Sequence, residues 1–341
     1  MATYHDETEL QRSAPEFAAP TLAEIRHAAD VLRGTIRRTP LLRCDTLDRR
    51  TNTTVLIKPE CLQRTGSFKL RGAYHKISSI PPAERQRGVV AFSSGNHAQA
   101  VALAARLLQT HAEILMPNDT PAAKLHATRA HGAEVVFYSR EHDDREALAM
   151  SLAEQQGMTL VHPYDDPLVI AGQGTLALEL IDDAGPDGLD ALVVPISGGG
   201  LIAGCAIVVK GLNPNIKMIG VEPQDGNDTQ RSLHAGRRIR IPSPHTIADA
   251  LRAVEPGRLT FEVLRQLVDD VVVVSDQALV AAMRFCFEYL HLVVEPAGAA
   301  SIAAVLSGRA GPAGSRVGAV ISGGNINLEQ FVALTTGRDT A

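Results

Sequence analysis

Three apolar segments of this chain end in a serine-glycine turn. The turns are Ser93-Ser94-Gly95, Ser197-Gly198-Gly199-Gly200 and Ser322-Gly323-Gly324. Strand-like runs alternate with helical patterns along the chain, and that alternation is typical of a parallel sheet covered by helices. Ligands of such sheets bind outside the carboxyl ends of the strands. The sequence therefore predicts an α/β fold in which the three turns converge on one cleft.

Hydrophobic periodicity and turn residues divide the chain into three parts. Residues 88–162 form a complete small α/β unit, residues 21–87 and 163–341 form a larger one, and residues 1–20 are a polar tail. The expected strands are 55–58, 88–92, 112–116, 135–137, 191–194, 218–221 and 317–321. The expected helices are 22–32, 69–80, 98–108, 121–131, 171–181 and 201–210.

Composition excludes several classes of function. The net charge is -5, no long basic block is present, and aromatic residues make up 4% of the chain with no tryptophan, which argues against nucleic-acid binding. No apolar run approaches ~18 residues, so we expect no membrane span, and residues 1–20 lack the apolar core of a signal peptide. We expect a cytoplasmic protein with reduced thiols, without disulfides or zinc ligands. The cysteines, which show no paired spacing, are Cys44, Cys61, Cys205 and Cys286.

Lys69 stands at the expected start of a helix, in the stretch Thr-Gly-Ser-Phe-Lys-Leu-Arg-Gly-Ala. The positive end of the helix dipole disfavours the ammonium form there. A lysine that loses its proton becomes an amine nucleophile. Taken alone, such a lysine is more often a surface residue whose amine reaches solvent. The function of Lys69 therefore depends on what the rest of the chain supplies.

The turn Ser197-Gly198-Gly199-Gly200 precedes an expected helix. Successive glycines let backbone N–H groups approach an anion closely, as in a phosphate cradle, and a flexible hinge is the alternative. The stretch matches neither Gly-Lys-Ser/Thr nor Gly-x-Gly-x-x-Gly. A phosphate cradle and an isolated nucleophilic lysine together indicate pyridoxal phosphate, which requires both. Ser322 is the candidate partner of the ring nitrogen, and a hydroxyl there suits β-elimination better than transamination.

Five motifs, in order along the chain, resemble the serine/threonine dehydratase family. Besides the Lys69 stretch they are Ser-Ser-Gly-Asn-His-Ala-Gln-Ala, Ala-Gly-Gln-Gly-Thr, Ser-Gly-Gly-Gly-Leu-Ile-Ala-Gly and Ser-Gly-Gly-Asn. The resemblance extends over about residues 21–331. It implies the two-domain, tryptophan-synthase-β-like architecture (fold type II) of pyridoxal-phosphate enzymes, each domain a mostly parallel sheet flanked by helices. Threonine ammonia-lyase and serine racemase are members of that family.

The resemblance implies cofactor roles for residues within these motifs. Lys69 is expected to bind pyridoxal phosphate covalently and to remove the α-proton of the substrate, and Phe68 to pack beside the ring. Asn96 is expected to hydrogen-bond the ring hydroxyl. The phosphate is expected at Ser197, Gly198, Gly199 and Gly200, and the ring nitrogen at Ser322.

The resemblance also implies a substrate site. Ser94 is the candidate proton donor on the face opposite Lys69, with a plain turn hydroxyl as the alternative. Arg145 and Lys124 stand where relatives place basic residues near the pocket, with solvated helix faces as the alternative. The residues expected to receive the substrate's α-carboxylate are Ser93, Ser94, Asn96 and His97.

Residues 222–228 resemble the loop that binds a divalent cation in serine racemase. Glu222 and Asp228 supply carboxylates and Gly226 supplies a carbonyl, which are the oxygen ligands that Mg²⁺ or Ca²⁺ prefers. Such an ion would stabilise the fold without taking part in the chemistry. The alternative is an ordinary solvated acidic loop.

The activity implied by the resemblance is dehydration of a small β-hydroxy amino acid, with L-threonine or L-serine favoured, to a 2-keto acid and ammonia. Serine racemase, 3-hydroxyaspartate dehydratase and the dehydratase of hydroxyectoine utilisation stay open as alternatives. So does a pyridoxal-binding protein without catalytic activity, which an intact Lys69 argues against. A homodimer or homotetramer is expected. A C-terminal regulatory domain is not expected, because the chain ends soon after Ser322.

The substrate is the least determined part of this prediction. Ala250 and Ala253 stand where relatives have a glycine and a serine near the pocket. A 3-hydroxyaspartate enzyme needs an additional cation for the second carboxylate. Arg145 and Arg252 are the candidates for it.

Overall fold

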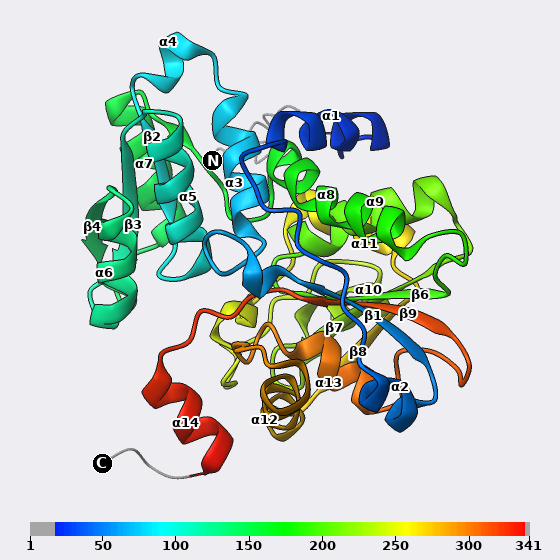
Figure 1. Cartoon of the computed structure of the whole chain (residues 1–341). Helices are drawn as coiled ribbons and strands as arrows, with labels where there is room; N and C mark the ends of the chain where they lie inside the picture. Colours follow the sequence, from blue (N-terminus) through cyan, green and yellow to red (C-terminus); the bar gives the residue numbers. More distant parts are fainter. Residues whose placement is uncertain (1–17, 338–341) are drawn as a thin grey trace, which may run out of the picture.

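The computed structural model describes residues 18–337, so most of the expected polar tail lies outside the described residues. Two separate parallel sheets, each flanked by helices, form an α/β structure (Figure 1). No helix within the described range is long and apolar enough to cross a membrane.

The larger sheet has five strands in the order β1-β9-β6-β7-β8, all paired in parallel. Side chains of β6 alternate between two cores on opposite faces of this sheet: Ala191 and Val193 belong to one, Leu192 and Val194 to the other. Such continuous apolar strands are expected where helices cover both faces. The strands are β1 (Thr54–Pro59), β6 (Ala191–Pro195), β7 (Lys217–Pro223), β8 (Asp270–Val274) and β9 (Arg316–Ile321).

The smaller sheet has four parallel strands in the order β4-β3-β2-β5. They are β2 (Val89–Phe92), β3 (Ala112–Pro117), β4 (Glu134–Tyr138) and β5 (Thr159–Leu160). All of them fall within residues 88–162, the range predicted for the small unit. Leu70, Ala73 and Ile77, which precede that range, nevertheless pack into the core of the smaller sheet. The domain limits stay a prediction.

Helices surround both sheets (Figure 1). The first seven are α1 (Leu22–Leu32), α2 (Asp45–Thr51), α3 (Lys69–Ser78), α4 (Pro82–Arg85), α5 (Asn96–Leu107), α6 (Ala122–Ala130) and α7 (Arg145–Gln156). The next seven are α8 (Pro167–Ala184), α9 (Gly200–Leu212), α10 (Asp228–Ala235), α11 (Arg258–Leu267), α12 (Asp276–Phe285), α13 (Ala300–Leu306) and α14 (Leu328–Thr336). Short helical turns are η1 (Glu60–Leu62), η2 (Asp249–Leu251) and η3 (Cys286–Leu290).

The predicted start of the helix at residues 171–181 is wrong. Helix α8 begins at Pro167, where the Asp166 side chain accepts hydrogen bonds from the N–H groups of Leu168 and Val169. Gly172 and Gly174 therefore lie inside the helix. A Cβ atom on Gly172 would stand 2.6 Å from the Arg71 carbonyl oxygen of α3. These glycines do not open the helix; they let neighbouring helices pack closely against it.

Candidate active site

Lys69 is the first residue of α3, as the sequence predicted. The segment before it is attached to the end of β9: Ser67 forms an antiparallel bridge with Gly323, and the Phe68 N–H donates to the Ser322 carbonyl, 3.1 Å away. Two of the motifs, far apart in the sequence, are therefore joined through their backbones next to Lys69.

The Lys69 amine contacts a backbone carbonyl oxygen and an aromatic ring. Its Nζ donates a hydrogen bond to the Pro163 carbonyl oxygen at 2.6 Å and stands 5.2 Å from the centre of the Phe68 ring. No carboxylate of the described residues forms an ion pair with it. Burial lowers the pKa of Lys69 to about 8. Burial therefore weakens the ammonium form, as the positive end of the helix dipole was expected to do, and the consequence is a more reactive amine.

The glycine turn begins α9 close to the Lys69 segment. Gly199 has a φ of +94° at the N-cap position, and no side chain caps the helix. The N–H groups of the first helical turn thus remain for a ligand. A Cβ atom on Gly198 would stand 2.3 Å from the Tyr164 ring. Tyr164 follows Pro163, the acceptor of the Lys69 hydrogen bond, so the turn and the lysine meet at one segment.

The loop after β2 also starts a helix. Gly95 occupies the N-cap of α5, and a Cβ atom placed on it would have no other atom within 4 Å. The Ser93 Oγ accepts a hydrogen bond from the Gly95 N–H at 3.2 Å. His97 is buried, its Nε2 lies 2.8 Å from the Val161 carbonyl oxygen, and burial lowers the pKa of its imidazole to about 3. His97 is therefore a neutral side chain turned toward β5, and the carboxylate-binding role of this loop stays a prediction.

Asn96 links this loop to the turn after β9. Its Oδ1 accepts a hydrogen bond from the Asn325 Nδ2 at 2.7 Å, and Asn325 also donates to the Thr65 carbonyl oxygen. Ser322, at the end of β9, is 6% exposed. The structure therefore brings together the three turns and the Lys69 segment, as a shared ligand site requires.

Comparison with known proteins identifies the family of the chain. Residues 32–323 match the family model described as pyridoxal-phosphate dependent enzyme. The chain belongs to this family.

Named relatives within the pyridoxal-phosphate dependent enzymes cover nearly the whole chain. An L-threo-3-hydroxyaspartate ammonia-lyase of a Pseudomonas species is 49% identical over 92% of this chain and 98% of its own length. An L-threonine ammonia-lyase of Thermotoga maritima is 42% identical over 91% of this chain and 77% of its own length. The structure of maize serine racemase superposes with a TM-score of 0.87 and 40% identity, covering 91% of this chain and 95% of that one.

These findings confirm the predicted serine/threonine dehydratase family, the fold type II architecture, and pyridoxal phosphate as the cofactor of a lyase. The individual site assignments stay predictions, although several groups present suit the cofactor. An uncapped helix start beyond a glycine turn suits its phosphate. In the segment before Lys69, the hydroxyl oxygens of Thr65 and Ser67 are buried without a hydrogen-bond partner, which is unusual in a folded protein. The segment that precedes Lys69 thus offers polar groups to a bound molecule.

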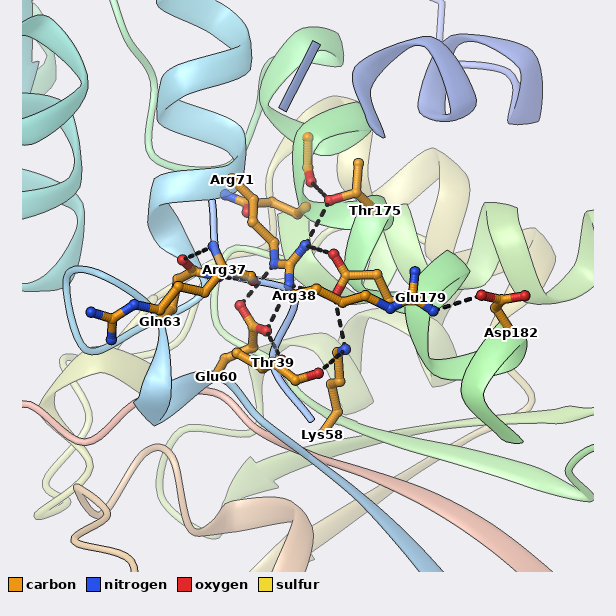
Figure 2. A network of polar contacts seen from close by, with 12 residues as sticks. Arg37, Arg38, Thr39, Lys58, Glu60, Gln63, Arg71, Thr175, Glu179 and Asp182 are labelled. Carbon is orange, nitrogen blue, oxygen red and sulfur yellow. Dashed lines mark hydrogen bonds and ion pairs between the residues drawn. The ribbon is translucent and has the colours of Figure 1, made fainter. Parts of the chain in front are cut away.

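A buried ion network centred on Arg71, two residues after Lys69 in the sequence, holds α3 in place (Figure 2). Arg71 is fully buried and donates five hydrogen bonds, two to Glu60, two to Glu179 and one to Thr175. Lys58, also fully buried, forms an ion pair with Glu179 at 2.7 Å. The two cations and the two carboxylates balance in charge. The sequence motif contained Arg71, but its partners could not be predicted because they lie on η1 and α8, outside the motif.

The predicted cation loop contains a closely spaced pair of buried carboxyl groups. Glu222 is the next-to-last residue of β7 and accepts hydrogen bonds from the N–H groups of Thr229 and Gln230. Asp228 begins α10, and its Oδ2 is buried without a partner. Burial raises the pKa of Glu222 to about 7, and burial together with the Glu222 charge raises that of Asp228 to about 8. A cation between them would offset the repulsion of their charged forms.

The three basic residues discussed for the substrate have different surroundings. Lys124, on α6, forms an ion pair with Asp249 of η2. Arg252 donates to the Thr246 carbonyl oxygen. Arg145 is exposed at the start of α7, and its guanidinium carbon stands 5.6 Å from the centre of the Phe92 ring. No acidic side chain in the described part of the chain pairs with Arg145.

Proposed function

We propose that this chain is an ammonia-lyase for a β-hydroxy amino acid with a second carboxylate, of the L-threo-3-hydroxyaspartate type. The reaction removes the α-proton and releases the β-hydroxyl as water, and hydrolysis of the released product gives oxaloacetate and ammonia. The name and 49% identity of the Pseudomonas relative support this choice over serine or threonine. The Thermotoga relative makes L-threonine the second candidate.

The proposal rests on the position of Arg145 and on its lack of an ion-pair partner among the described residues. Phe92, the ring below its guanidinium, is the last residue of β2 and directly precedes Ser93 and Ser94. Arg145 therefore stands beside the loop expected to receive the α-carboxylate. A guanidinium without an ion-pair partner can bind a carboxylate through two parallel hydrogen bonds. Neither Lys124 nor Arg252 is equally available, because both already contact oxygen atoms of the protein.

The chain's own groups supply positioning and proton transfer. Pyridoxal phosphate, when bound, accepts the electron pair left at the α-carbon. The Lys69 amine is the base that takes the α-proton, since its lowered pKa lets it exchange a proton near neutral pH. The start of α5 orients the α-carboxylate through N–H groups and the helix dipole. We propose Ser94 as the proton donor of a racemisation side reaction.

Substrate comparison and one arginine variant test the proposal. Keto-acid formation from L-threo-3-hydroxyaspartate, L-threonine and L-serine is measured with the holoenzyme, and we expect the highest kcat/KM for hydroxyaspartate. Arg145→Met should lower that value by about 10- to 100-fold, the effect of one charge-assisted contact, and leave L-serine nearly unchanged. Arg252→Met is the matched control. A higher kcat/KM for L-threonine would refute the proposed substrate, and an equal loss for all three substrates would refute the role of Arg145.

Two further properties belong to the proposal. We propose that Glu222, Asp228 and the Gly226 carbonyl bind Mg²⁺ or Ca²⁺, supported by the partnerless Asp228 oxygen. A cytoplasmic homodimer or homotetramer is also proposed. Its support is the four free cysteines, which suit a reducing compartment, and the exposed apolar side chains of Phe287 and Leu328.

A further inference from the structure

Glu295 is a buried carboxyl group beside the turn after β9, and the sequence motifs did not indicate it. It lies between η3 and α13 and is 4% exposed. Its backbone N–H donates to the Gly323 carbonyl oxygen at 3.2 Å. Its Oε1 accepts a hydrogen bond from the Asn96 Nδ2 at 2.6 Å. One carboxyl group thus contacts both the loop after β2 and the turn after β9.

The absence of a side chain at Gly323 makes room for this carboxyl group. A Cβ atom on Gly323 would stand 2.2 Å from the Glu295 Oε1 and 3.3 Å from the Asn96 Nδ2. The first distance is far inside van der Waals contact, and the second is a tight contact. Gly323 directly follows Ser322, so the Glu295 carboxyl lies within the site where the cofactor ring is expected.

Two hydrogen bonds determine the orientation of the Asn96 amide. Asn325 donates to the Oδ1 of Asn96, and Glu295 accepts from its Nδ2. A flipped amide would place donor against donor at Asn325. An amide nitrogen has two N–H groups, and Glu295 takes one of them. The second has no acceptor within residues 18–337.

We propose that Glu295 is a positioning residue, which holds the Asn96 amide so that its second N–H group can donate a hydrogen bond to an oxygen of the bound ligand. This inference rests on the proposed contact between Asn96 and the ring hydroxyl of the cofactor. Glu295 acts through Asn96 and needs no bond to substrate or cofactor.

The surroundings of Glu295 keep its carboxyl group neutral near pH 7. Burial raises its pKa to about 8, and the charge of Asp249 on η2 acts in the same direction. The hydrogen bond from Asn96 and the charge of Lys124 on α6 oppose that rise. The thiol of Cys61, on η1, is the remaining titratable group nearby, and burial raises its pKa to about 12. A neutral acid accepts the Asn96 hydrogen bond without placing a negative charge beside the ring, so glutamine is its close mimic.

The experiment measures cofactor affinity and the absorbance of the bound cofactor, neither of which is turnover. Purified apoprotein is titrated with pyridoxal phosphate. Glu295→Met, which keeps the volume but lacks an acceptor, should weaken binding about tenfold and shift the absorbance band. Glu295→Gln should bind within about twofold of the parent, with an unshifted band. Near-ultraviolet circular dichroism of each apoprotein checks the fold.

The double variant separates this inference from the proposed role of Asn96. If Glu295 acts through Asn96, then Asn96→Ala with Glu295→Met should bind no more weakly than Asn96→Ala alone. Additive losses, or a Glu295→Met protein with parental affinity and spectrum, would overturn the inference. An Asn96→Ala protein with parental affinity would instead show that Asn96 does not contact the cofactor. That result would refute the proposed role of Asn96 and, with it, the role of Glu295. If Glu295→Met does not fold, Asn325→Ala removes the other hydrogen bond and should give the same tenfold loss; parental affinity would overturn the inference.

Discussion

Replacing Arg71 by methionine removes the central cation of the buried network that joins α3 to η1 and α8 (Figure 2). Methionine retains most of the aliphatic volume, so the change removes charge and hydrogen bonds with little loss of packing. Five hydrogen bonds are lost, four of them to carboxylates. Glu60 is left fully buried, with the Thr39 hydroxyl as a neutral partner.

The expected cost follows from the charge left behind. Before the change, Lys58 and Arg71 balance Glu60 and Glu179; afterwards one cation faces two carboxylates. Removing one partner of a buried ion pair costs about 3–5 kcal/mol, because the other charge stays desolvated. The matched control is Arg33→Met, whose pair with Asp30 is exposed and contributes at most about 1 kcal/mol.

The assay is urea unfolding of parent, Arg71→Met, Glu60→Gln and the double variant, followed by circular dichroism. Arg71→Met should lose about 3–5 kcal/mol of unfolding free energy. Glu60→Gln in the Arg71→Met background should recover part of that loss, because no buried carboxylate then lacks a cation at this position. A loss below about 1 kcal/mol for Arg71→Met, equal to the exposed control, would refute the reasoning.

Two further predictions concern titration and metal binding. The rate at which an amine reagent labels Lys69 in the apoprotein should rise about tenfold per pH unit and level off near pH 8, because burial disfavours its ammonium form. Mass spectrometry measures the labelling, with surface Lys217 as the internal standard. A labelling rate that levels off near pH 10 would contradict this prediction. Mg²⁺ or Ca²⁺ should raise the melting temperature of chelator-treated protein. Asp228→Asn should abolish that rise; an equal response in both proteins would remove the site.

The fold was accessible from the sequence because its signals are local. Apolar runs, turn residues and helix caps lie within a few positions of one another, so strands such as β9 and the start of α3 were predicted closely. The Ala-Gly-Gln-Gly-Thr stretch was wrongly predicted to begin a helix. Glycine is typical of helix ends, but it also occurs where two helices pack closely. Only the packing of α8 against α3 shows that these glycines serve close helix packing.

The sequence by itself determined the cofactor chemistry, since a lysine at a helix start, a glycine cradle and a strand-end serine are short motifs. Tertiary structure decided what surrounds them. Asn96 and Glu295 are 199 positions apart, and Arg71 and Glu179 are 108 apart. Burial, which lowers the pKa of Lys69 and raises that of Glu295, is a property of packed neighbours and has no local pattern. Ion pairs between distant residues also have no local pattern. Only the structure therefore showed that Lys124 pairs with Asp249, whereas Arg145 has no acidic partner among the described residues.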